Sequence, residues 1–181
     1  MLNLGGKAVP NKCKGDSFEL LPELEDKSFD LVLTDPPYDL DCTQQIDLHK
    51  QFVRLSRTGV IVFSPPENPW PIAANQYLFW IKPISTKNTS KRYSRFVEMI
   101  FLYGDLKWNH DRHWSQYTNV FNDLVDNSKL HSHRKPPSLI ERLVLNHSDP
   151  GDLILDPFAG SGVVADVCKA TDRLSYSIDI A

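Results

Sequence analysis

The sequence predicts an α/β protein built on a doubly wound, mostly parallel sheet, and two observations lead to that fold class. The first is a set of short apolar runs of strand length, at 31–33, 60–63, 153–155 and 174–178. The second is a set of segments with helical spacing of apolar residues, at 44–56, 139–144 and 163–168. Strand, helix and strand in this rhythm predict parallel strands joined by crossovers.

Length and composition narrow the class further. The 181 residues predict a single domain, 1–181, and the 41% of hydrophobic residues is enough for a core without cross-links. No apolar run approaches the ~20 residues of a membrane span, so no membrane partner is expected. Three widely separated cysteines predict free thiols in a reducing cytoplasm, without a metal site. The net charge of −3 argues against a generally basic nucleic-acid surface.

The run at 31–33 leads into the motif Asp35, Pro36, Pro37 and Tyr38. The two prolines hold the chain extended and remove backbone donors, so the strand exit is rich in acceptors. Two fixed acceptors can bind both hydrogens of a ring amino group and free its lone pair to attack a methyl group. The tyrosine ring can stack on a base that has left its helix. The alternative interpretation is an ordinary strand end closed by a proline turn.

A second motif follows the run at 153–155. It comprises Asp156, Pro157, Phe158, Gly160, Gly162 and Ala165. Glycines at this spacing between a strand and a helix allow close approach of the backbone to a nucleotide. Asp179 ends the next strand about 20 residues further on, where such units carry a ribose-binding carboxylate. Together these features predict a nucleoside-containing cofactor.

Other segments carry weaker signals. Asp16 or Ser17 is expected to cap a short helix, which leaves open whether Asp16 also contacts a ligand. His49 is expected on the surface of its helix. The loop between strands at 77–84 and 96–103 is basic, with Lys87, Lys91, Arg92 and Arg95. These cations can follow a phosphate backbone, or form a solvated hairpin tip.

Both motifs together resemble the family of DNA adenine-N6 and cytosine-N4 amino-methyltransferases, in the permuted order with the catalytic motif first. The segment 133–143 resembles the family sequence just before the glycine loop. The resemblance implies a Rossmann-like sheet of the S-adenosylmethionine-dependent methyltransferase type. It also implies S-adenosylmethionine as cofactor and double-stranded DNA with a flipped base as substrate.

The resemblance also implies residue roles. Asp35 and Pro36 would accept the hydrogens of the target amine, and Tyr38 would stack on the base. On the cofactor side, Asp179 would bind the ribose and Lys135 would approach the methionine end. The remaining cofactor contacts would come from Asp16, Ser17, Asp156, Pro157, Phe158, Gly160 and Gly162. An aspartate at the first motif position resembles adenine-N6 enzymes more than cytosine-N4 enzymes.

Two departures from the family pattern concern substrate recognition. The target-recognition segment is reduced to about 105–130, and the sequence stops at Ala181, where relatives usually add a helix. Specificity is therefore expected to be relaxed, or to be completed by a second subunit such as another copy of the chain. The leading hypothesis is methylation of adenine N6 in the DNA of a bacterial or phage-infected cell. Methylation of cytosine N4 or an RNA base, a non-catalytic DNA-binding subunit and, last, a dinucleotide oxidoreductase are the alternatives.

Overall fold

The computed structural model describes residues 2–4, 7–9, 11–82, 96–124 and 134–180. The basic loop with Lys87, Lys91, Arg92 and Arg95 lies outside the described residues. Among the helices of the described ranges, none is both long and apolar enough to cross a membrane.

An eight-stranded sheet in the order β3-β10-β9-β4-β5-β7-β6-β8 forms the centre of the molecule. Strands β5–β7 and β7–β6 pair antiparallel, and the other neighbours pair parallel. The strands are β3 (Lys12–Lys14), β4 (Phe29–Thr34), β5 (Ser56–Ser64), β6 (Gln76–Ile81), β7 (Val97–Gly104), β8 (Val120–Phe121), β9 (Leu153–Asp156) and β10 (Leu174–Asp179). A separate antiparallel pair precedes them, β1 (Leu2–Leu4) with β2 (Lys7–Val9).

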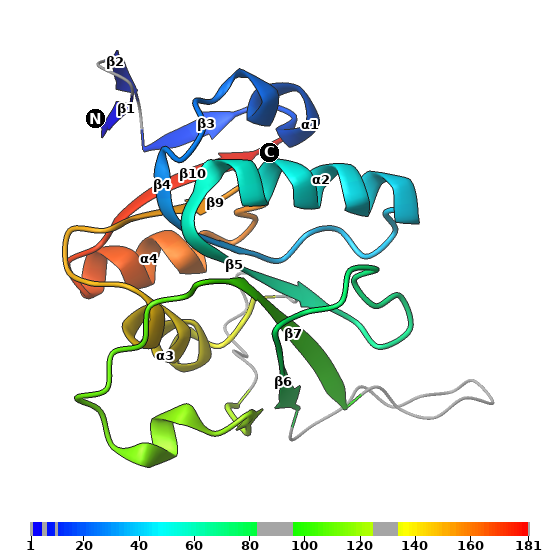
Figure 1. Cartoon of the computed structure of the whole chain (residues 1–181), viewed down its shortest axis with the longest axis vertical. Coiled ribbons are helices and arrows are strands. Elements are labelled where there is room, and N and C mark those ends of the chain that lie inside the picture. The colour runs from blue at the N-terminus through cyan, green and yellow to red at the C-terminus, as the bar shows by residue number, and fades with distance from the viewer. Residues whose placement is uncertain (1, 5–6, 10, 83–95, 125–133, 181) are drawn as a thin grey trace.

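Helices cover both faces of this sheet (Figure 1). Helix α2 (Cys42–Leu55) lies on one face, and helices α3 (Pro137–His147) and α4 (Val163–Ala170) lie on the other. The shorter elements are α1 (Ser17–Leu20) and the 3-10 helices η1 (Leu21–Glu23) and η2 (Trp114–Tyr117). The predicted doubly wound, mostly parallel α/β class is confirmed.

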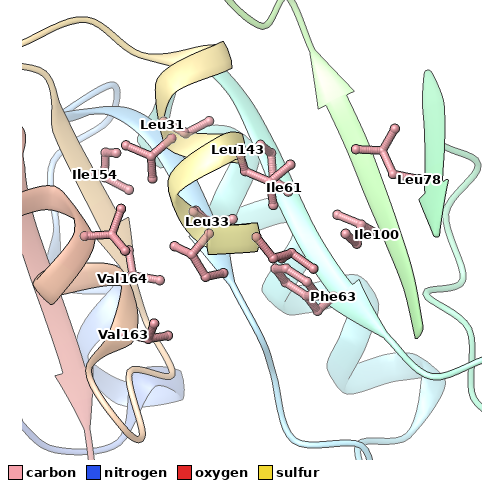
Figure 2. Close-up of a cluster of buried hydrophobic side chains, with 14 of the residues drawn as sticks. Leu31, Leu33, Ile61, Phe63, Leu78, Ile100, Leu143, Ile154, Val163 and Val164 are labelled. Atoms are coloured by element: carbon pink, nitrogen blue, oxygen red, sulfur yellow. The ribbon is translucent and has the colours of Figure 1, made fainter. Parts of the chain in front are cut away.

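The middle of the central strand β4, residues 31–33, is apolar because both faces of the sheet are covered there. Leu31 and Leu33 of β4 point into the cluster under α3 and α4, whereas Val32 points into the cluster under α2. Figure 2 shows the first cluster, with Leu143 of α3 over the sheet near Ile61 of β5. All five side chains are fully buried.

Helix α2 corrects one expectation. Its start is fixed by a capping box, in which Asp41 and Gln44 each bond the other's backbone N–H. His49 is buried rather than on the surface: it accepts a hydrogen bond from Trp70 Nε1 at 3.2 Å and meets the edge of Tyr103. Burial lowers the pKa of His49, which keeps the ring neutral and able to accept this bond.

Two further segments complete the fold, the first of which local patterns did not predict. The short, charged β3 pairs with β10 and so extends the sheet beyond β10. The segment 105–124 is largely irregular, as expected, and contributes only η2 and the two-residue β8.

The pairing of β4 with β9 positions the candidate site. Leu31 pairs with Ile154, and Val32 with Leu155, so the two strands end at the same edge of the sheet. The chain leaves β4 towards β5 on one side and leaves β9 towards β10 on the other. This is the topological switch point at which open α/β sheets bind ligands.

Leu143→Ala tests the packing of α3 on the sheet. The leucine is completely buried, so its truncation should lower the free energy of unfolding by about 2–5 kcal/mol. Urea denaturation of the variant and of Glu141→Ala, an exposed position on the same helix, gives the comparison. A loss no larger than that of Glu141→Ala would contradict this packing.

Candidate active site at the switch point

The motif predicted to be catalytic leaves β4 at the switch point. The carboxylate of Asp35 is half-buried, and its Oδ1 accepts a hydrogen bond from the Tyr38 hydroxyl at 3.1 Å. The Tyr38 side chain is exposed, which leaves its ring available for stacking. Asn68 Nδ2 donates to the carbonyls of Tyr38 and Leu40 at 3.0 and 3.1 Å, and so holds the exit loop in place.

Lys135 reaches this motif from the segment before α3. Its buried ammonium pairs with Asp35 Oδ2, donates to the Tyr38 hydroxyl at 2.9 Å and lies 3.0 Å from Glu98 Oε2. Lys82 pairs with the other oxygen of Glu98. The expected approach of Lys135 to the cofactor's methionine end stays a prediction, and the contacts observed are with the catalytic motif.

Sequence reasoning missed Glu98. It is buried on β7, as the single charged residue in an otherwise apolar strand. A charged residue in such a strand was the available signal, because buried carboxylates need a partner. Its partners, the two lysines, come from distant segments and could not be identified locally.

The charges of this cluster depend on one another. Burial raises the pKa of Asp35, against the lowering effect of Lys135. Burial alone would raise the pKa of Glu98, but Lys135 and Lys82 bring it below its usual value. For Lys135, burial would lower the pKa, and the carboxylates of Asp35 and Glu98 raise it instead. The ammonium therefore stays charged and holds two carboxylates.

Asp156, at the end of β9, lies beside the catalytic motif but has a different environment. Its buried Oδ1 accepts from Thr34 Oγ1 and from the Phe158 N–H, both at 3.2 Å. Burial raises the pKa of Asp156 to about 7. The bond from Thr34 joins the tips of β4 and β9 directly.

The segment before α1 meets the glycine loop. The Ser17 hydroxyl donates to the Pro157 carbonyl. Asp16 accepts from the Phe18 N–H at 2.9 Å, which confirms its role as a helix cap, while contact with an adenine ring stays a prediction. The backbone of Asp179 receives a bond from the Gly15 N–H at 3.0 Å, so β10 and this segment border the same corner.

The loop after Asp156 fits a nucleoside-containing cofactor. Gly160 and Gly162 have φ angles of +45° and +74°, which favour glycine, and no atom lies within 4 Å of a Cβ built at Gly162. Ser177 pairs with Asp156 across β9 and β10, and its buried hydroxyl has no hydrogen-bond partner in the described part of the chain. Open backbone beside an unsatisfied hydroxyl suits a polar ligand.

The segment 105–124 lies mostly at the other end of α3. Asn109 and Arg112 both bond to Asn146, near the carboxyl end of that helix. The chain returns to the amino end only at Asp123, which accepts a bond from the Ser138 hydroxyl at 2.6 Å. Only the end of the described segment therefore approaches the side of the sheet where Lys135 lies.

Asp156→Asn tests the raised pKa through stability. The pKa of Asp156 is about 7 in the folded chain and near the ordinary value of 3.8 in the unfolded chain. The folded state therefore binds the proton of this carboxyl more tightly. Its contribution is complete below about pH 4 and is lost as pH rises to about 7. Between pH 5 and 6 the wild type should lose roughly 1 kcal/mol per pH unit relative to the variant, and the loss should level off as pH passes 7.

Denaturant titrations across this range measure the difference. Asp47→Asn, an exposed carboxylate on α2, should run parallel to the wild type. Parallel behaviour of Asp156→Asn as well would mean that the buried carboxyl titrates normally.

The chain is similar to known DNA methyltransferases in sequence. A family model described as DNA methylase, of the N6/N4 methyltransferases, matches residues 60–181. Type II methyltransferase M.HpaI of Haemophilus parainfluenzae is 25% identical over 91% of this chain and 68% of its own length.

Two solved structures share the fold. The M1.HpyAVI–SAM complex has a TM-score of 0.73 at 21% identity and covers 94% of this chain and 93% of its own. The cytosine-N4-specific PvuII DNA methyltransferase has a TM-score of 0.70 at 18% identity and covers 94% of this chain and 81% of its own. S-adenosylmethionine is the methyl donor of this class of enzymes, as the sequence resemblance implied. The chain belongs to the N6/N4 DNA methylase family.

Proposed function

We propose that this chain transfers a methyl group from S-adenosylmethionine to N6 of adenine in DNA. The observation that carries the proposal is the pairing of β4 with β9, which brings the acceptor motif at Asp35 beside the glycine loop after Asp156. A base and a cofactor held at these two strand ends would share one crevice.

The residues at the tip of β4 suit an amino group as the acceptor of the methyl group. The Asp35 carboxylate and the Pro36 carbonyl can each accept one hydrogen of the amine, and the prolines offer no competing donor. Tyr38 can hold the ring by stacking. Nitrogen so held would direct its lone pair at the methyl group of bound S-adenosylmethionine. The S–CH3 bond would break as the N–CH3 bond forms, the sulfur would leave as a neutral thioether, and the methylated nitrogen would release one proton to solvent.

The residues at the tips of β9 and β10 suit the cofactor. Gly160 and Gly162 allow close backbone approach, and the Asp179 carboxylate can accept from ribose hydroxyls. The Ser17–Pro157 hydrogen bond brings the segment before α1 to the same loop. The further candidate contacts with the cofactor are therefore Asp16, Ser17, Pro157 and Phe158.

Adenine is the favoured target because an aspartate opens the catalytic motif, as in adenine-N6 members of the family. Cytosine N4 is the second candidate, because the cytosine-N4-specific PvuII enzyme has the same fold. Two segments are proposed to contact the DNA. One is the segment at about 105–130, and the other is the basic loop with Lys87, Lys91, Arg92 and Arg95. A second subunit, including a second copy of the chain, stays a prediction, as does action in the cytoplasm.

One experiment tests the reaction and the target together. The purified chain is incubated with methyl-labelled S-adenosylmethionine and duplex DNA, and the digested nucleosides are identified by mass spectrometry. Label in N6-methyl-2′-deoxyadenosine supports the proposal, and label in N4-methyl-2′-deoxycytidine favours the second candidate. No label in DNA would overturn both, and a parallel RNA substrate tests that alternative.

Asp35→Asn should remove most of the activity. The amide keeps the shape but loses the charged acceptor, so methyl transfer should fall by about 10²–10³-fold while cofactor binding changes little. Single-turnover rates and calorimetric titration with S-adenosylmethionine measure the two effects. Asp47→Asn, which removes an exposed carboxylate, is the control. Activity retained in Asp35→Asn would overturn the acceptor role.

Asp179→Ala should instead weaken cofactor binding and leave the methyl-transfer step little changed. Loss of hydrogen bonds between a carboxylate and ribose hydroxyls should weaken S-adenosylmethionine binding by about 10–100-fold, since charge-assisted bonds contribute about 1.5–3 kcal/mol each. Saturating cofactor should restore much of the turnover. Unchanged affinity would exclude Asp179 from the cofactor site.

A further inference from the structure

The catalytic carboxylate is already occupied in this structure. Asp35 Oδ1 accepts from the Tyr38 hydroxyl, and Asp35 Oδ2 is paired with the Lys135 ammonium. An ammonium N–H and an amino N–H are similar donors, so Lys135 stands where a hydrogen of the target amine would have to bind.

A second carboxylate, that of Glu98, lies beside the same ammonium. Glu98 Oε2 lies 3.0 Å from Lys135 Nζ, which is an ion-pair distance, and no other partner of this buried oxygen lies in the described ranges. The other carboxylate oxygen is fixed by Lys82. Glu98 is thus a rigid, charged acceptor with hydrogen-bonding capacity to spare.

We propose that Lys135 is a placeholder for the target amine: its ammonium occupies Asp35 in the enzyme without DNA and turns to Glu98 when the amino group enters. The inference rests on the proposed function and assigns Lys135 and Glu98 as positioning residues. Neither has to touch the transferred methyl group.

The charge balance favours such an exchange. Lys82, Glu98, Lys135 and Asp35 alternate in sign, so the ammonium has a carboxylate partner in either position and is never buried alone. The aromatic rings of Phe63 and Tyr38 lie 5.2 and 5.5 Å from it and stabilise a cation between the two carboxylates. A neutral amine can therefore displace the ammonium from Asp35 while Glu98 keeps it paired, and the Asp35 carboxylate would then accept from the amine and from the Tyr38 hydroxyl.

The proposal predicts opposite pH effects for two variants. Lys135, Tyr38, Glu98 and Asp156 are the titratable groups that act on Asp35, and Lys82 acts through Glu98. Loss of the Lys135 charge should raise the pKa of Asp35, whereas loss of the Glu98 charge should lower it. Residues whose charges do not act on Asp35 would give no such opposition, and the rise in KM for DNA in Glu98→Gln tests the exchange itself.

The experiment measures kcat/KM for DNA methylation against pH, which reports groups of the free enzyme. In Lys135→Met the acidic limb of the pH profile of kcat/KM should move up by roughly 1–3 pH units. In Glu98→Gln it should move down, and KM for DNA should rise by about tenfold because the displaced ammonium loses its receiving carboxylate. Limbs that stay in place, or that move together, would overturn the placeholder role.

Matched controls separate this effect from general damage. Lys107→Met removes a lysine that also bridges two carboxylates, Asp149 and Asp152, at an exposed site. Glu141→Gln removes an exposed carboxylate. Both should keep the wild-type limb, and Lys135→Arg, which keeps the charge, should restore it towards the wild-type position. Thermal unfolding confirms that each variant is folded.

A readout without turnover distinguishes failure of this inference from failure of the proposed function. The Lys135 ammonium signal, assigned in ¹⁵N-lysine NMR spectra by its loss in Lys135→Met, should shift in Asp35→Asn and in Glu98→Gln. An unshifted signal would overturn the contacts themselves. A wild type that methylates no nucleic acid would overturn the proposed function instead, whatever the spectra show.

Discussion

The short parallel pairing between β4 and β9 is the constraint on which the site depends. It joins two strands that are more than a hundred residues apart in the chain, and it is supported by the Thr34–Asp156 hydrogen bond, whose partners are 122 positions apart. Helices on both faces bury these strands, and the Asp35 motif and the glycine loop follow directly at their carboxyl ends. The chemistry is concentrated there because the rest of both strands is committed to the core.

The two neighbouring strand tips carry acids in unlike electrostatic states. Asp35 has a cation in direct contact, which helps it ionise despite burial. Asp156 has hydrogen bonds but, among the residues that the structure describes, no cation as a direct partner, and burial raises its pKa to about 7. Neighbouring carboxyls that differ in this way can share a crevice with less repulsion than two full charges. The difference also separates a charged acceptor from a largely structural acid.

Local sequence patterns predicted the central strands and the crossover helices, because each depends on a run of apolar residues or on glycine and proline. Glu98 and the burial of His49 escaped prediction for a shared reason: their partners, Lys135 for the first and Trp70 for the second, are brought in by tertiary contacts. The pairing of β3 was missed because three residues give no periodicity. Long-range ion pairs leave no local pattern to detect.

The arrangement of acceptors also bears on how a base is chosen. Adenine and cytosine both carry an exocyclic amino group with two hydrogens, so a carboxylate and a carbonyl cannot by themselves tell them apart. The exposed ring of Tyr38 would stack on any base in its proposed role, because every base has a π face. Discrimination must therefore reside in surfaces that meet the ring edges or the flanking nucleotides. Of the segment 105–124, the part near Asp123 approaches the amino end of α3, so base selection at that edge would fall to very few of its residues.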